Sequence, residues 1–223
     1  MAIVYNTSIV RSNLFLHLDA ANIKSYPGSG TTWFDLSGNG NHGTIINSPT
    51  YNGASFTFAN ASSQTVSIPY RSEWRLIGSN TISFWSNGTD ANHAAIGYQK
   101  GNWEGYIVGP TSAVYSSITG GNDNGASAIS KTASEWCLLT WVVNRSTNLY
   151  TLYKNDTLVS TASITHPDLS SIFTNGALTV GGSAGITGRF YTGSISNVML
   201  HTKALSTSEV SQNFNALRGR YGI

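Results

Sequence analysis

The segment Trp136–Asn144 is the feature that most restricts what this chain can fold into. Its sequence, WCLLTWVVN, is apolar at odd and at even positions, whereas a strand with one face in water alternates apolar and polar residues. The segment therefore predicts a strand that is covered on both faces. Such a strand lies at the centre of a sheet that packs against a second layer.

Shorter strand signals occupy much of the remaining chain. Asn148–Lys154 and Thr157–Ser163 flank the pair Asn155-Asp156, and these two residue types tolerate the positive φ angles of a tight hairpin turn. Leucine alternates with other residues in Leu14–Leu18, which predicts a half-buried strand. Further strands are expected at Thr65–Ile68, Thr81–Ser86, Ala94–Gln99, Gly105–Val108, Ala113–Ile118, Leu178–Gly181 and Tyr191–His201.

The C-terminal region predicts one helix. Ser206 is followed three residues later by Glu209, which is the spacing of a capping box. Val210, Phe214 and Leu217 then recur at helical spacing. Since no helices alternate with the strands, a doubly wound α/β fold is excluded. We predict an all-β, antiparallel two-sheet jelly-roll sandwich with a short C-terminal helix.

Composition excludes several classes of protein. The 12 basic and 10 acidic residues give a net charge of only +2, which is too small and dispersed for a nucleic-acid-binding surface. The longest apolar segment is far shorter than the roughly 18 residues that a membrane span needs, so membrane insertion is not expected. Met1–Asn6 lacks the charged and apolar regions of a secretory signal, so ordinary export is not expected either.

We expect one domain at residues 13–223, because a chain of 223 residues with so many strand signals usually forms a single sandwich. Residues 1–12 precede the first strand. They are expected to form an N-terminal arm for attachment or for contacts between subunits. The alternative is a frayed chain end, which any terminus can form.

Several motifs follow one another in the order of a known family. Leu14–Gly43 reads LFLHLDAANIKSYPGSGTTWFDLSGNGNHG, and the pieces TISFWS, EWCLLTWVVN, LYKNDTLV and FYTGSISNVMLHTKALSTSEV come later. Over about residues 12–217 the chain resembles the laminin-G-like branch of the concanavalin-A-like lectin/glucanase jelly rolls. Its opening, HLDAAN followed by SYPGSGTTW, resembles versions in structural proteins of tailed bacteriophages. The resemblance implies two antiparallel sheets with edge loops that in relatives bind sugars, sometimes with calcium.

The residues expected to bind a sugar lie in the middle of the chain. A sugar site needs an aromatic face for the ring and planar polar groups for the hydroxyls. The candidates are Tyr98, Trp103, Glu104, Asn122 and Asp123. The alternative for Trp103 is a place in the core or in a subunit contact. By the family resemblance, a packing role is expected for Trp33, Trp85, Trp136 and Trp141.

Asp19, Asp35 and Asn39 are candidate ligands for calcium. Hard cations take about six to eight oxygens, and loops rich in Asn, Asp and Gly supply them. The alternative is that Asp35 accepts backbone N–H bonds in an Asx-type turn that shapes its loop. Relatives often carry an acidic pair after a Gly-x-Ile motif, where this chain has Ser196 and Asn197. This departure weakens the calcium prediction.

The sequence predicts a protein that is not an enzyme. Glycoside hydrolysis needs two facing carboxylates. The glucanase members of the family resembled carry theirs as Glu-x-Asp-x-Glu, which is not present here. The histidines also lack the His-x-x-x-His spacing of metal hydrolases. A glycan hydrolase built from dispersed carboxylates is the weakest alternative.

Together these features predict a non-enzymatic accessory structural or adhesion protein of a bacteriophage particle, of the capsid-decoration or fibre type. A virion protein needs no secretion signal, because lysis delivers it outside the cell. Its expected partners are other capsid or tail proteins, further copies of itself in a homo-oligomer, and host or environmental glycans. The alternative is a free carbohydrate-binding lectin, which would share every feature except attachment to the particle.

Overall fold

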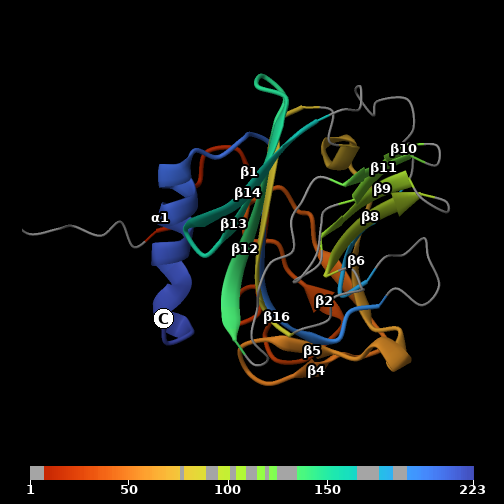
Figure 1. The fold of residues 1–223 in the computed structure, drawn as a ribbon. Helices are drawn as coiled ribbons and strands as arrows, with labels where there is room; N and C mark the ends of the chain where they lie inside the picture. The colour runs from red at the N-terminus through yellow and green to blue at the C-terminus, as the bar shows by residue number, and fades with distance from the viewer. Residues whose placement is uncertain are drawn as a thin grey trace, which may run out of the picture.

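The computed structural model of the chain describes residues 8–75, 78–88, 95–100, 104–108, 115–118, 121–124, 135–164, 176–182 and 190–223. Two antiparallel sheets pack against each other, and one helix lies on the outer face of the first sheet (Figure 1). This arrangement confirms the predicted all-β, two-sheet jelly-roll sandwich with a short C-terminal helix.

The first sheet carries the helix and contains the predicted central strand. β12 (Trp136–Asn144) pairs with β7 (Asn80–Asn87) on one side and with β13 (Leu149–Lys154) on the other. Residues 137–143 are all buried, so this strand is covered on both faces as predicted. The remaining strands of the sheet are β14 (Thr157–Ser163), β16 (Gly193–His201), β5 (Phe56–Phe58), β4 (Thr50–Tyr51) and β1 (Leu14–Asp19), which pairs with β16.

The second sheet faces the first and also contains eight strands. Two short 3-10 helices, η1 (Asn60–Ser62) and η2 (Ser72–Arg75), flank its strand β6 in the sequence. The strand order in this sheet is β11 (Gly121–Asn124), β10 (Tyr115–Ile118), β9 (Glu104–Val108), β8 (Ile96–Lys100), β15 (Leu178–Val180), β6 (Thr65–Ile68), β3 (Gly43–Ile46) and β2 (Thr32–Trp33).

A core of aromatic and aliphatic side chains from both sheets joins the two layers. Trp33 of β2 meets Phe56 of β5 edge to face, with ring centroids 4.8 Å apart. Trp33, Trp85 and Trp141 are fully buried, and Trp136 is partly buried. The expected packing role of these tryptophans is therefore confirmed.

β13 and β14 form the predicted hairpin, joined by Asn155 and Asp156. Asn155 has a positive φ angle of 60°, as a tight turn of this kind requires. Its side-chain Oδ1 accepts a hydrogen bond from the Leu138 N–H at 3.0 Å. The turn is thereby tied to the central strand β12.

β1 occupies the predicted position, but it is not half-buried. His17 and Asp19, which alternate with the leucines, are only 5% and 2% exposed. The Leu36 N–H donates to the His17 carbonyl at 2.8 Å, and Arg220 from the C-terminus bridges Asp19. Segments distant in the sequence thus cover this strand. The alternation of apolar and polar residues along the strand itself does not predict that coverage.

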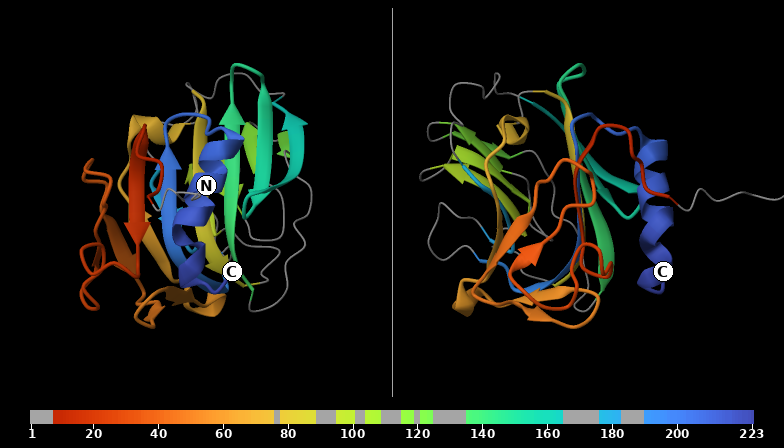
Figure 2. Two further views of the ribbon diagram at one scale, coloured as in Figure 1. Left: turned by 90° about the vertical axis from the view of Figure 1, so that its left-hand side faces the viewer. Right: turned by 180° about the vertical axis from the view of Figure 1, so that it is seen from behind.

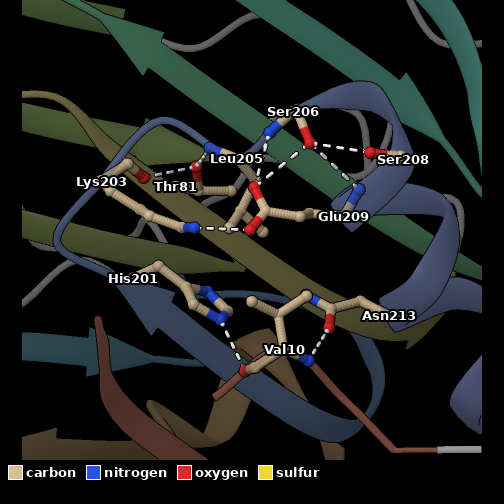
Figure 3. A network of polar contacts seen from close by, with 9 residues as sticks. All are labelled: Val10, Thr81, His201, Lys203, Leu205, Ser206, Ser208, Glu209 and Asn213. Atoms are coloured by element: carbon tan, nitrogen blue, oxygen red, sulfur yellow. Dashed lines mark hydrogen bonds and ion pairs between the residues drawn. The ribbon is translucent and has the colours of Figure 1, made fainter. Parts of the chain in front are cut away.

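α1 (Thr207–Leu217) begins with the predicted capping box. Ser206 Oγ accepts from the Glu209 N–H at 3.3 Å, and Glu209 Oε2 accepts from the Ser206 N–H at 3.0 Å (Figure 3). Figure 2 shows the helix on the outside of the first sheet from two further directions. Its predicted apolar face is buried at Val210, Phe214 and Leu217. Within the described part of the chain, no helix reaches the length and hydrophobicity of a membrane span.

The residues just before β1 pack between α1 and the first sheet. Ile9 and Val10 are 6% and 5% exposed. The Val10 N–H donates to Asn213 Oδ1 at 2.7 Å, and the Val10 carbonyl lies 3.1 Å from His201 Nε2 (Figure 3). This part of the expected N-terminal arm is anchored to the domain rather than lying outside the sandwich. Residues 1–7 lie outside the described residues.

Two buried histidines predict that acid destabilises the fold. Burial lowers the pKa of His17 and of His201 from 6.5 to about 4. Between these pH values the unfolded chain binds more protons than the folded chain, so the free energy of unfolding falls as the pH decreases. From pH 6.5 to about pH 5 we expect a loss of about 2 kcal/mol for each histidine, measured by urea unfolding at constant salt.

Variants separate the contribution of one histidine from the rest. His201→Gln should remove about half of the pH dependence, because one of the two titrating groups is lost. Ile23→Ala, at an exposed position without a titrating side chain, is the control and should leave the pH dependence unchanged. The same pH dependence in the wild type and in both variants would contradict this account.

Candidate functional site

A surface groove of about 390 Å³ lies where three segments of the chain meet. The segments are β1, the loop between β2 and β3, and the residues that follow β6. The lining combines two aromatic side chains with amide, hydroxyl and charged groups: Phe15, Asn39, Asn41, Tyr70, Arg71, Ser72 and Glu73.

An irregularity at Phe15 shapes the β1 side of the groove. The register between β1 and β16 shifts at this residue, and bulges of this kind change the direction of a side chain. The Phe15 carbonyl accepts hydrogen bonds from the loop that follows β2. The donors are Ser37 Oγ at 2.9 Å, Asn39 Nδ2 at 3.2 Å and Asn41 Nδ2 at 2.7 Å. The bulge and the loop therefore hold each other in place.

Asp35 fixes the shape of the same loop. Its Oδ1 accepts from the N–H groups of His17 at 2.8 Å and Ser37 at 2.9 Å. Its Oδ2 accepts from the Asn41 N–H at 3.0 Å, and the single Ser37 hydroxyl proton is shared between Oδ2 at 2.7 Å and the Phe15 carbonyl. Both carboxylate oxygens of this buried side chain thus bind donors within the protein. This is the turn-shaping role that the sequence offered as the alternative to calcium binding.

The other two candidate calcium ligands also have partners. Asp19 Oδ2 lies 2.7 Å from Arg220 Nη1, and Asp19 Oδ1 accepts from the Ala21 N–H at 3.1 Å. Asn39 donates through its Nδ2 to backbone carbonyls of β1. Among the described residues, no three His, Cys, Asp or Glu side chains gather into a group that could hold a metal ion. Calcium binding stays a prediction, and the geometry supports the turn-shaping role of Asp35.

Arg71 is oriented by a buried amide. Its Nε donates to Asn41 Oδ1 at 3.0 Å, and Asn41 is only 2% exposed. Arg71 itself is exposed, as are Ser72 and Glu73. Ser72 Oγ donates to Glu73 Oε2 at 3.1 Å. The groove therefore presents a positioned cation, a carboxylate and hydroxyl and amide groups beside two partly buried aromatic rings.

The sugar-binding residues expected from the sequence lie in another region. Tyr98 is on β8 and Glu104 is on the neighbouring strand β9. Asn122 and Asp123 are on β11, the last strand in the order of the second sheet (Figure 1). The fold thus brings four of these residues onto the same end of the second sheet, with β10 between β9 and β11, whereas Trp103 lies outside the described residues. Sugar binding by this group stays a prediction.

Sequence reasoning did not single out the groove residues Tyr70, Arg71 and Glu73. They directly follow β6 in the sequence PYRSEW, and an aromatic residue with charged neighbours in a loop at a strand end is a signal for binding. Phe15 gave no such signal, and Asn41 counted only as a member of the loop that carries the candidate calcium ligands Asp35 and Asn39. Their roles depend on a bulge and on a hydrogen bond between residues 26 positions apart.

The sequence also establishes the family. The laminin G profile of the concanavalin A-like lectin/glucanases superfamily matches residues 60–211. This chain belongs to that superfamily. The match confirms the resemblance inferred from the motifs, while the resemblance to tailed-phage versions stays a prediction. No curated protein sequence matches the chain.

Several solved structures share the fold of this superfamily member. Trypanosoma rangeli sialidase in complex with sialic acid is 11% identical, with a TM-score of 0.65 over 92% of this chain and 33% of the sialidase. The binding domain of botulinum neurotoxin DC in complex with rat synaptotagmin II is 15% identical, with a TM-score of 0.64 over 93% of this chain and 52% of the toxin domain. The chain thus spans about half or less of these two proteins.

A third structure matches the chain over nearly its whole length. Domain 4 of AbnA, an extracellular arabinanase from Geobacillus stearothermophilus, in complex with arabinotriose, is 17% identical to this chain. The TM-score is 0.64, over 91% of this chain and 98% of that domain. At such low identities the likeness shows the fold alone, which is a lectin-type jelly roll.

The turn-shaping role of Asp35 predicts a loss of stability in Asp35→Asn. The amide nitrogen replaces an oxygen that accepts N–H bonds, and a hydrogen bond to a charged group contributes about 1.5–3 kcal/mol. We therefore expect the free energy of unfolding in urea to fall by about 2–3 kcal/mol. Asp156→Asn, in the exposed hairpin turn, is the control and should change it by less than about 0.5 kcal/mol. Equal stabilities of the two variants would contradict the role.

The same variants distinguish the turn from a calcium site. If Asp35 shapes the turn, the melting temperature of the wild-type chain should be the same in EDTA and in excess CaCl2. A ligand that binds only the folded state raises the melting temperature. A rise in CaCl2 that is lost in Asp35→Asn would therefore support calcium and overturn the turn-shaping account.

Proposed function

We propose that this chain is a non-catalytic glycan-binding domain and that the groove beside Phe15 and Tyr70 holds the sugar. The observation that carries the proposal is the lining of the groove. Sugar rings have an apolar face and a rim of hydroxyls, so they bind where aromatic rings lie beside fixed donors and acceptors. This groove combines two aromatic residues with the exposed amide of Asn39, a hydroxyl, a guanidinium and a carboxylate, while the buried amide of Asn41 orients the guanidinium.

The polar groups of the groove are held in place before any ligand arrives. Asn41 is buried and makes hydrogen bonds through its backbone N–H and through both atoms of its side-chain amide. Asn39 is fixed to the bulged strand through Nδ2. Side chains that are already ordered lose little conformational entropy on binding, which favours affinity. This preorganisation supports a ligand site over a solvated surface.

A structural neighbour supports the same proposal. Domain 4 of the arabinanase AbnA is covered over 98% of its length and was solved in complex with arabinotriose. That domain, which has the same fold and a similar length, therefore binds an oligosaccharide. We carry this property to the present chain as part of the proposal.

The acidic groups of the groove favour binding over hydrolysis. Hydrolysis of a glycoside uses two carboxylates placed about 5–10 Å apart. Among the described residues that line the groove, Glu73 supplies the carboxylate and the remaining side chains are aromatic, neutral or basic. Turnover of a polysaccharide that is abolished by Glu73→Gln would restore the enzymatic alternative.

The finer part of the proposal is that the domain acts as an accessory adhesion protein on a phage particle. It rests on the resemblance of HLDAAN and SYPGSGTTW to tailed-phage structural proteins. On a particle, a glycan-binding domain would hold the virion to host or environmental polysaccharides. Copies would be arranged by the symmetry of the particle. A free lectin is the alternative, and mass spectrometry of purified particles distinguishes the two roles.

The ring of Tyr70 should contribute to glycan affinity, because it lines the groove. Tyr70→Leu keeps apolar volume against the core but removes the flat face, so glycan affinity should fall about tenfold, or about 1.4 kcal/mol. Binding is measured on a glycan array and then by titration calorimetry with the strongest ligand. Ile23→Ala changes an exposed side chain outside the groove and should bind like the wild type. Equal affinities of the two variants would remove the groove from the proposal.

Mass spectrometry of density-purified phage particles from the source should find this chain at a fixed ratio to the major capsid protein. The ratio would show which symmetry site it occupies. Absence of the chain from particles whose other components are intact would overturn the virion role and leave the free lectin.

A further inference from the structure

We infer that the groove selects glycans that carry a carboxylate, such as those containing uronic acids, and that Arg71 is the residue that recognises it. The inference rests on the proposed glycan-binding function of the groove and adds the chemical class of the ligand. It is carried by the way Arg71 is held and by the donors it leaves available.

Arg71 is fixed through one end of its guanidinium. Nε donates to Asn41 Oδ1 at 3.0 Å. Asn41 in turn donates from Nδ2 to the Phe15 carbonyl at 2.7 Å and from its backbone N–H to Asp35 Oδ2 at 3.0 Å. Each of these hydrogen bonds ends on strand β1 or on the loop that is bound to β1. The orientation of the arginine is therefore set by the fold.

The other end of the guanidinium has no anion within the described part of the protein. Ion pairs there join Lys154 to Glu135, Lys203 to Glu209 and Arg220 to Asp19. Arg71 takes part in none of them, and its hydrogen bond in the described structure is the one to Asn41. Nη1 and Nη2 are the planar pair of donors that matches the two oxygens of a carboxylate.

The partner of Nε is a neutral amide, so the hydrogen bond does not neutralise the charge of Arg71. An aspartate at position 41 would hold the arginine equally well but would neutralise its charge. Asn41 orients the guanidinium and leaves its positive charge in the groove. A cation that is positioned but not neutralised binds an anionic ligand more strongly than a mobile one, because less side-chain entropy is lost.

The negative charge of Glu73 should act in the opposite direction to the positive charge of Arg71. It lines the same groove and receives a hydrogen bond from Ser72 at 3.1 Å. Its carboxylate can accept sugar hydroxyls, but it repels a second negative charge. The groove is thus suited to a sugar with one carboxylate at Arg71 and hydroxyls toward Glu73. Removing the charge of Glu73 should strengthen the binding of acidic glycans while removing that of Arg71 weakens it.

The test is a glycan array in which each uronate-containing oligosaccharide is printed beside its carboxyl-reduced counterpart, and the strongest pair is then titrated by calorimetry. We expect the acidic member of the pair to bind at least about tenfold more tightly, since a charge-assisted bidentate contact is lost in the reduced sugar. Arg71→Gln should abolish this preference, and Arg71→Lys should keep only part of it because the planar pair of donors is lost. Glu73→Gln should increase it.

Controls separate this inference from the proposed function. Lys24→Gln removes one positive charge at an exposed position outside the groove and should retain the wild-type preference. Equal binding of both sugars, unchanged in Arg71→Gln but weakened in Tyr70→Leu, would overturn the inference and leave the glycan-binding function intact. If the folded wild-type chain binds no glycan on the array, both the inference and the proposed glycan-binding function are overturned.

Discussion

The carboxylate of Asp35 joins the first strand of the sandwich to the loop that forms part of the groove. β1 pairs with β16 on one edge, and the backbone groups on its other edge also need partners. Asp35 accepts the His17 N–H, and the Leu36 N–H satisfies the His17 carbonyl. The second oxygen of Asp35 accepts the Asn41 N–H. The positions of Asn41 and Arg71 are therefore set by the same interaction that completes the edge of the sheet.

The C-terminal helix determines which surfaces remain for a ligand. Trp85, on the outer face of the first sheet, stacks on Tyr221 with ring centroids 4.0 Å apart and on Phe214 at 5.8 Å. Ile9, just before β1, joins the same buried cluster. These contacts cover apolar surface that would otherwise face water. The inner faces of both sheets form the core, so the edge loops, which lie outside it, are one place where the described structure presents polar groups to a partner.

Local signals in the sequence were sufficient for much of the fold. The central strand Trp136–Asn144, the Asn155 turn and the Ser206 capping box all depend on residues close in sequence, and each is found where it was expected. The groove depends instead on contacts between distant residues. The bond from Arg71 to Asn41 spans 30 positions, and the bulge at Phe15 exists only relative to β16. The sugar-binding residues predicted between Tyr98 and Asp123 rest on local sequence, which carries no information about such contacts.

Chemical-shift mapping shows most directly whether a glycan binds in the groove. The measurement is a titration of the 15N-labelled chain with its strongest glycan ligand, followed through the backbone amides. The account predicts that the largest shifts fall on Asn39, Asn41, Arg71 and Ser72, the amides that surround the groove. Shifts that instead gather on β8–β11, with the groove amides unchanged, would contradict it and return the site to the strands that carry Tyr98 and Glu104.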